Sequence, residues 1–342
     1  MVYLGDFHIF GAELFKGGVN KMSNSMVSAK SPSKGLARKK KTIILLSMLA
    51  PGAIWLILLR YLPMFGVVIS FQRFKIYTKD PTLLNNILHS NWVGFKNFEF
   101  LFANSDSWKM IRNTVGYNAL WIILGTVIAV AFAIMLSLLT KKFVAKTYQT
   151  LMFFPYFLSW VVASFFLMAF LDATNGLIPN LQKQLGMEVT QWYMNNKPWP
   201  ILLTVAYLWK NIGYSTVLYL AAITGIDGSQ YEAASIDGAT KWQQIRFVTL
   251  PHLKTMVIIL FIMSVGRIVN SDFGLFYQVP LNSGPLFPTT QVMDTYVYRA
   301  FLATNNPGMS AAASLLQNVV GLFCVLIANS IVRRIDEESS LF

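Results

Sequence analysis

The chain is 342 residues long, 55% of its residues are hydrophobic and only 13% are charged. Soluble domains usually carry about 25% charged residues, so this composition excludes an ordinary soluble protein and predicts an all-α, polytopic membrane protein. The net charge of +13 does not indicate a nucleic-acid partner, because Lys and Arg are spread through the chain and form no basic face with interleaved aromatic residues.

The first 41 residues are predicted to be a cytoplasmic arm. Its stretch "NKMSNSMVSAKSPSK" is polar and reads as partly disordered, or as an over-extended start. The apolar run that begins at Thr42 is long and has no small-residue cleavage site. We therefore predict that it remains as a membrane anchor and is not a signal peptide.

Six segments are long and apolar enough to cross the membrane as helices, which takes about 20 residues each. They are residues 42–59, with a continuation to Phe71 kinked near Pro63, then 117–140, 147–171, 199–223, 254–269 and 309–332. The fourth contains Lys210 and the fifth contains Arg267, whereas the second, third and sixth contain no charge. Residues 42–335 are thus predicted to form one transmembrane domain.

Six spans place both termini, including a short tail at residues 336–342, on the same side of the membrane. The basic run 38–41 and the basic flanks of the other inner loops indicate that this side is the cytoplasm. The outer segments 72–116, 172–198 and 270–308 are long and rich in Asn, Pro and aromatic residues, which predicts an ordered outer face.

One inner loop, residues 229–251, has the pattern of a folded element. Ser229 or Gln230 is expected to begin a helix with Glu232 in its first turn, and Gly238 is expected to end or bend that helix. Pro251 suits the first turn of the helix that follows. The prediction is helix, bend, helix and then a membrane span.

This loop resembles the EAA loop of importer permeases in the ABC transporter superfamily, through Glu232, Ala233, Ala234, Gly238, Val248, Leu250 and Pro251. The resemblance implies the six-helix fold of type I importers and a coupling helix that docks in a cleft of a separate ATPase. The residues expected to carry this coupling are Glu232, Ala233, Ala234, Asp237, Gly238, Ala239, Leu250 and Pro251. The alternative is an amphipathic loop lying on membrane lipid, anchored by Trp242.

Downstream segments support a narrower resemblance. "SVGRIVNSDFGLFYQVPLNSGPLFPTTQVMDTYVYR", "AAASLLQNVVGLFCVLIANSIVRRI" and "TYQTLMFFPYFLSWVV" resemble carbohydrate permeases of the LplB type, relatives of the maltose permease subunit MalF. Thr255 departs from the expected pattern, where a proline is usual. The resemblance implies an ATP-dependent oligosaccharide importer in a bacterial cell membrane, with a second permease that makes a heterodimer, two ATPase subunits and an extracellular or lipid-anchored solute-binding protein.

Ionisable groups at membrane depth usually face a cavity or a partner, which makes Lys210, Arg267 and Asp272 candidates for a transport path. Neighbouring polar and aromatic groups extend the predicted path to Trp209, Asn211, Tyr214 and Asn270. For Lys210 and Arg267 the alternative is an ion pair or a carbonyl contact at a subunit interface, and for Trp209 and Tyr214 it is packing or a membrane-interface belt. Cations along the path would suit an acidic sugar such as a uronate.

Two other functional classes are disfavoured. The chain has three His and one Cys, with no H-E-x-x-H pair and no Cys/His cluster, so neither an enzyme nor a metal site is expected. It also has no G-x-x-x-x-G-K-[ST] loop, so no cofactor is expected in this chain, and ATP and Mg should bind to the partner ATPase. The alternative function is a secondary, ion-coupled transporter, which would usually show internal repeats, or another polytopic membrane subunit.

Overall fold

The computed structural model describes residues 34–75, 82–103, 105–337 and 340–341. Most of the predicted arm, residues 1–33, lies outside the described residues, as do residues 338, 339 and 342 of the predicted tail. The chain forms two compact units, Met1–Phe65 and Gly66–Phe342.

The described part of the first unit is helical throughout. Helix α1 (Lys34–Leu56) begins inside the predicted arm and runs into a π turn, η1 (Ile57–Tyr61), and a 3-10 stretch, η2 (Leu62–Phe71), that continues into the second unit. Residues Lys41–Phe71 together are long and apolar enough to cross a membrane. The helix type therefore changes around Pro63, because proline has no backbone N–H to donate.

The secondary structure in the described part of the second unit is helical apart from one short ladder, in which β1 (Gln72–Arg73) runs antiparallel to β2 (Asn91–Trp92). Its longer helices are α4 (Ser105–Ser137), α5 (Lys142–Phe153), α6 (Trp160–Leu171), α8 (Trp199–Thr224), α11 (Leu250–Val265), α14 (Met293–Thr304) and α15 (Pro307–Ile335). Shorter helices are α2 (Leu83–His89), α3 (Lys96–Glu99), α7 (Leu177–Gln184), α9 (Gly228–Ile236), α10 (Lys241–Gln244), α12 (Phe273–Gln278) and α13 (Phe287–Thr290), with turns η3 (Phe154–Phe157), η4 (Ile245–Thr249) and η5 (Gly284–Leu286).

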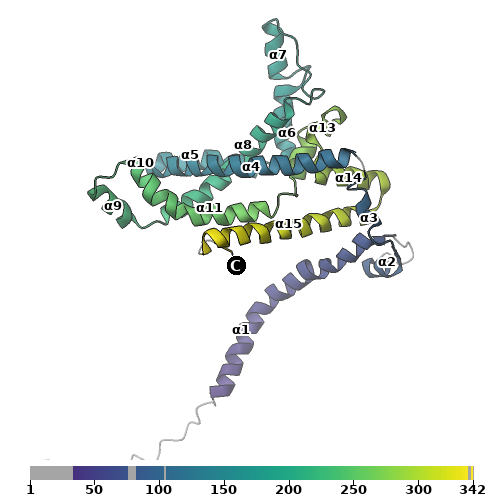
Figure 1. Ribbon diagram of the computed structural model, residues 1–342, viewed down its shortest axis with the longest axis horizontal. Coiled ribbons are helices and arrows are strands. Elements are labelled where there is room, and N and C mark those ends of the chain that lie inside the picture. The colour runs from purple at the N-terminus through teal and green to yellow at the C-terminus, as the bar shows by residue number, and fades with distance from the viewer. Residues whose placement is uncertain (1–33, 76–81, 104, 338–339, 342) are drawn as a thin grey trace, which may run out of the picture. The chain divides into compact units, whose positions relative to one another are not determined.

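The bundle is built around α4, α8 and α11. Helix α4 packs along α8, α11 contacts both, and α15 runs beside α11 (Figure 1). Ala129 and Ala133 of α4 are fully buried against Tyr219 of α8 and Leu253 of α11, because their small side chains let the helices approach closely.

Helices α11 and α15 touch through backbone. Gly266, at the end of α11, lies against Gly321 of α15, and a Cβ atom at Gly321 would overlap the Gly266 carbonyl group. A Cβ atom at Gly266 would in turn overlap the side chain of Val325. Only glycine fits at this crossing.

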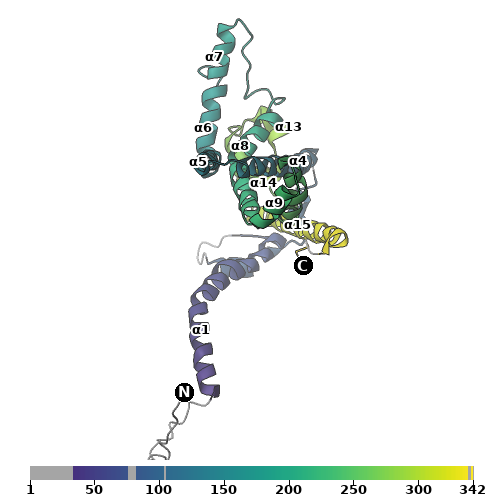
Figure 2. The same cartoon turned by 90° about the vertical axis from the view of Figure 1, so that its left-hand side faces the viewer.

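The third predicted span is not one straight helix. Residues Lys142–Phe157 and Trp160–Leu171 are bent by 99° at a short break, so α6 and α7 project away from α4 and α5 (Figures 1 and 2). Pro155 lies in η3 before the break, and the side chain of Ser159 caps α6 after it by accepting from the backbone N–H of Val162. These two residues end one helix and begin the next.

In the described residues, four helices are long and apolar enough to span a membrane, or five if the bent pair is one span. The remaining predicted span corresponds to α8, which has 26 residues and hence sufficient length. Helix α8 is not among the helices that are apolar enough, and Lys210, Asn211 and several hydroxyl groups interrupt its apolar sequence.

Candidate functional site

The inner loop begins with α9, which is capped differently from the prediction. The N-cap is Asp227, whose carboxylate accepts from the backbone N–H of Ser229 at 3.0 Å, and neither Ser229 nor Gln230 serves as the cap. This hydrogen bond lowers the pKa of Asp227 below its usual value. Because α9 starts at Gly228, Glu232 lies beyond the first turn, and the prediction that it occupies that turn is wrong.

Gly238 makes the corner between α9 and α10. Its φ of +77° lies in the left-handed region, where glycine carries no steric cost. The Gly238 N–H donates to Ser235 and the N–H of Ala239 to Ala234, which satisfies carbonyls at the end of α9. Thr240 then caps α10 in a reciprocal capping box with Gln243.

Helix α10 continues through η4 into α11, so residues Lys241–Val265 form one span. Two side-chain hydrogen bonds fasten α9 to it: the hydroxyls of Tyr231 and Thr249 lie 3.0 Å apart, and the Gln244 amide donates to the Ser235 hydroxyl at 2.8 Å. The loop is therefore a folded extension of a membrane helix, as predicted.

The predicted coupling residues are accessible. Glu232, Ala233, Asp237, Gly238, Leu250 and Pro251 are exposed, and Ala234 and Ala239 are half-buried. Large apolar side chains of the same segment are also exposed, with Ile236 at 87%, Trp242 at 68% and Phe247 at 67%. An apolar surface of this kind is typical of an interaction site.

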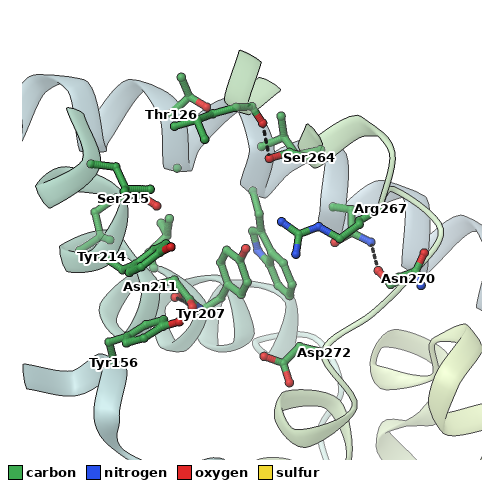
Figure 3. Close-up of a pocket in the computed structure, with 18 of the residues that line it drawn as sticks. Thr126, Tyr156, Tyr207, Asn211, Tyr214, Ser215, Ser264, Arg267, Asn270 and Asp272 are labelled. Atoms are coloured by element: carbon green, nitrogen blue, oxygen red, sulfur yellow. Dashed lines mark hydrogen bonds between the residues drawn. The ribbon is translucent and has the colours of Figure 1, made fainter. Parts of the chain in front are cut away.

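The second region is a cavity of about 430 Å³ between α4, α8, α11 and the segment that follows α11 (Figure 3). Five predicted path residues line it: Asn211, Tyr214, Arg267, Asn270 and Asp272. The prediction made from ionisable and amide groups on α8 and after α11 thus selected residues that line one cavity.

Two predicted path residues do not line this cavity. Trp209 is exposed and lines an apolar groove with Phe166, Phe170 and other side chains of α6 and α8. Lys210 is only 9% exposed, and its ammonium group donates to the carbonyls of Pro155, Tyr156 and Leu158. The carbonyl contact is therefore the correct interpretation of Lys210, and it lies within this chain.

Aromatic rings form much of the cavity wall. The rings of Tyr156 and Tyr214 stack with centroids 4.7 Å apart, and those of Trp121 and Tyr207 stack at 3.9 Å. Sequence reasoning missed Trp121 and also Asn118, whose amide donates to the carbonyls of Ile268 and Asn270 at 2.8 and 2.7 Å. The spacing of Asn118 and Trp121 on one helical face was the available signal.

The two charged side chains of the cavity, Asp272 and Arg267, differ in their contacts. Asp272 accepts from the indole N–H of Trp160 at 2.6 Å and caps α12 by accepting from the N–H of Leu275. Arg267 is exposed, and among the described residues no carboxylate lies at ion-pair distance from it. Among the residues that the structure describes, Arg267 is therefore a cation of the cavity wall that no carboxylate pairs with.

Comparison with known proteins gives consistent matches. A family model described as "Binding-protein-dependent transport system inner membrane component" matches residues 122–337. The polygalacturonan/rhamnogalacturonan transport system permease protein YteP of Bacillus subtilis is 33% identical, over 85% of this chain and 88% of its own. Protein LplB of the same organism is 29% identical, over 89% of this chain and 92% of its own.

Two solved structures have the same fold. One is a bacterial ABC transporter involved in import of the acidic polysaccharide alginate, with a TM-score of 0.75 and 28% identity over 88% of this chain and 99% of the other. The second is a bacterial alginate ABC transporter in complex with an alginate pentasaccharide-bound periplasmic protein, with a TM-score of 0.74 and 28% identity over 86% of this chain and 96% of the other.

Proposed function

Because this chain belongs to the family of binding-protein-dependent transport system inner membrane components, we propose that it is the permease subunit of an ATP-driven importer of acidic oligosaccharides. The cavity between α4, α8 and α11 would be part of the path. The observation that carries the acidic specificity is Arg267, an exposed cation in a cavity walled by tyrosines and amide groups.

The chemistry of the cavity fits a sugar acid. Stacked tyrosine rings offer flat apolar surfaces for sugar faces, while Asn211 and Asn270 offer polar groups for hydroxyls. A guanidinium binds a carboxylate in a bidentate fork. The name of the similar permease YteP refers to polygalacturonan, and a structural neighbour is involved in import of alginate, an acidic polysaccharide.

The inner loop would transmit the energy of ATP. We expect α9 and the corner at Gly238 to dock on a separate ATPase subunit, which binds ATP and Mg, while this chain performs no hydrolysis itself. The assembly would contain a second permease, two ATPase subunits and a solute-binding protein outside the membrane. Both termini would then lie in the cytoplasm, in line with the basic residues that flank the inner loops.

The test is uptake by the assembled transporter in proteoliposomes, with uronate and neutral oligosaccharides of equal length. Arg267→Met should lower uronate uptake by about 10- to 150-fold, since a hydrogen bond to a charged group contributes about 1.5–3 kcal/mol. Arg267→Lys keeps the charge but loses the bidentate fork, so it should fall between Arg267→Met and wild type. The control Arg334→Met removes an exposed cation near the end of α15, away from the cavity residues, and should change nothing.

Two results would count against the proposal. Preference of the wild-type transporter for the neutral sugar would exclude the acidic specificity. Equal losses of uronate and neutral uptake in Arg267→Met would mean that this side chain supports structure and does not read the carboxylate.

A further inference from the structure

The break between η3 and α6 leaves backbone groups that need partners. At a helix end the last carbonyls have no partner within the helix, and hydrocarbon supplies no water to replace one. On the donor side the Ser159 hydroxyl accepts from Val162 at 3.2 Å, which satisfies part of the start of α6. The carbonyl of Tyr156, in η3, and that of Leu158, within the break, require a donor from elsewhere.

Lys210 of α8 is that donor. Its ammonium group donates to the carbonyl of Leu158, to that of Tyr156 at 2.8 Å and more weakly to that of Pro155 at 3.5 Å. An ammonium has three N–H donors, and here they meet three carbonyls of one broken turn. The same nitrogen lies 5.7 Å from the ring centroid of Tyr156 and 5.4 Å from that of Trp160, within the range of cation–π contacts.

Close backbone packing surrounds the break. Gly213, about one turn after Lys210, lies against α5 so tightly that a Cβ atom would overlap the Met152 carbonyl group. A Cβ atom at Gly274 in α12 would likewise press into the Trp160 ring. The chain on both sides of the break is therefore held in one position by α8 and α12.

Residues on both sides of the break are connected to the cavity. Tyr156, whose carbonyl Lys210 binds, stacks its ring on Tyr214, and Trp160 holds the carboxylate of Asp272. Tyr156, Tyr214 and Asp272 line the cavity, whereas Lys210 and Trp160 do not. Two elements of the cavity wall thus depend on where the broken span turns.

We infer that Lys210 is a positioning residue, whose ammonium group satisfies the carbonyls of the broken span and thereby fixes the bend that places Tyr156 and Asp272 in the cavity. It makes no contact with the transported sugar. The effect on transport rests on the proposed function, whereas the effect on the bend does not.

The bend can be measured directly by the distance between two spin labels in the assembled transporter. In a Cys324→Ser background, Phe143→Cys on α5 and Ala169→Cys on α6 provide exposed sites on the two arms. With a rise of 1.5 Å per residue, the 99° bend puts these positions about 26 Å apart, and a straight helix would put them about 39 Å apart. Opening of the bend therefore appears as a longer or broader distance.

Lys210→Met keeps a long side chain and removes the charge, and it should lengthen or broaden the distance by several ångströms. Lys210→Arg keeps cationic donors and should stay close to the wild-type distance. Lys197→Met, which removes an exposed Lys just before α8, is the matched control and should leave it unchanged. A wild-type distance in Lys210→Met would overturn the inference. If Lys210→Met does not assemble, Lys210→Arg decides: a wild-type distance supports the inference and a lengthened one overturns it.

Uptake separates positioning from sugar binding. A positioning role predicts that Lys210→Met lowers uptake of uronate and neutral oligosaccharides in the same proportion, so that their ratio stays within about twofold of wild type. Loss of uronate uptake alone would make Lys210 a direct ligand and would overturn the inference. Failure of the acidic specificity itself would appear in the wild-type ratio and in Arg267→Met, while the label distances would be unaffected.

Discussion

Gly238 gives a prediction whose size can be worked out from backbone geometry alone. Its φ of +77° forms the corner between α9 and α10, and a Cβ atom built there meets nothing within 4 Å. Substitution therefore adds no collision, and the whole cost is that of a left-handed backbone, about 1–2 kcal/mol for an L-residue. Gly238→Ala should reduce the population of the native corner, relative to alternative loop shapes, by about 5- to 30-fold.

The expected result is weaker binding of the ATPase partner to the inner loop. If only the native corner docks, its lower population raises the apparent dissociation constant by up to the same factor. The assay is sugar-stimulated ATP hydrolysis by proteoliposomes, titrated with the purified ATPase subunit. The half-saturating concentration should rise for Gly238→Ala, rise further for the β-branched Gly238→Val, and rise least for Gly238→Asn, because Asn tolerates this backbone region.

The matched control is Gly228→Ala, ten residues earlier in the same loop. A Cβ atom at Gly228 also meets nothing within 4 Å, and its backbone does not lie in the left-handed region. It begins α9, where Ala is well tolerated. Half-saturating concentrations that are equal in Gly238→Ala, Gly238→Val and wild type would refute the reasoning, as would an effect of Gly228→Ala as large as that of Gly238→Ala.

Three further predictions concern packing, hydrogen bonding and pH. Gly213→Ala should destabilise the chain by about 1–3 kcal/mol through overlap with Met152, seen as a lower unfolding temperature in detergent, whereas Gly116→Ala, with open space around it, should not. Trp160→Phe removes the donor to Asp272 and should lower the maximal uptake rates of uronate and neutral sugars alike; a normal rate would mean that this hydrogen bond does not shape the cavity. Asp227→Ala should weaken coupled ATP hydrolysis while Asp227→Asn, also a good cap, preserves it. Because the pKa of Asp227 is lowered from 3.8, its contribution is present above about pH 4 and is lost only as pH falls through the lowered pKa, so the defect of Asp227→Ala should be constant from pH 6 to pH 8.

The inner loop was largely predictable because its determinants are local. A glycine at a corner acts within a few residues of its own position, and Gly238 occupies the corner expected of it. Pro251 instead lies inside the continuous span Lys241–Val265, just after the π turn η4, and does not begin a separate helix. The cap was misassigned because three neighbouring polar residues could all have served. Only the backbone dihedrals of Asp227, which are extended, select it.

The cavity between α4, α8 and α11 was predictable only from its polar members. Arg267 and Asp272 stand out in an apolar sequence because charge at membrane depth is costly. Asn118 and Trp121 did not, since they lie in an otherwise apolar run that reads as a plain span. A wall shared by three helices depends on their rotation about their own axes, which one sequence does not specify.

Lys210 shows why residue type alone misleads. A lysine in a membrane helix predicts a polar partner but not which one. Its partner is a helix break about 55 residues earlier, in a segment that reads as one uncharged span. Pro155 and Ser159 together were the signal for that break, as a helix interruption followed by a cap.

The continuous helical span from Lys241 to Val265 connects the inner loop directly to the wall of the cavity. At 1.5 Å per residue it is about 38 Å long, and at its Val265 end Gly266 lies directly on Gly321 without intervening side chains. With that contact as the fulcrum, a displacement of about 3 Å at Lys241 corresponds to a tilt of only about 5°. Arg267 is next to this contact, so a displacement of the inner loop would rotate its guanidinium group more than it would translate it.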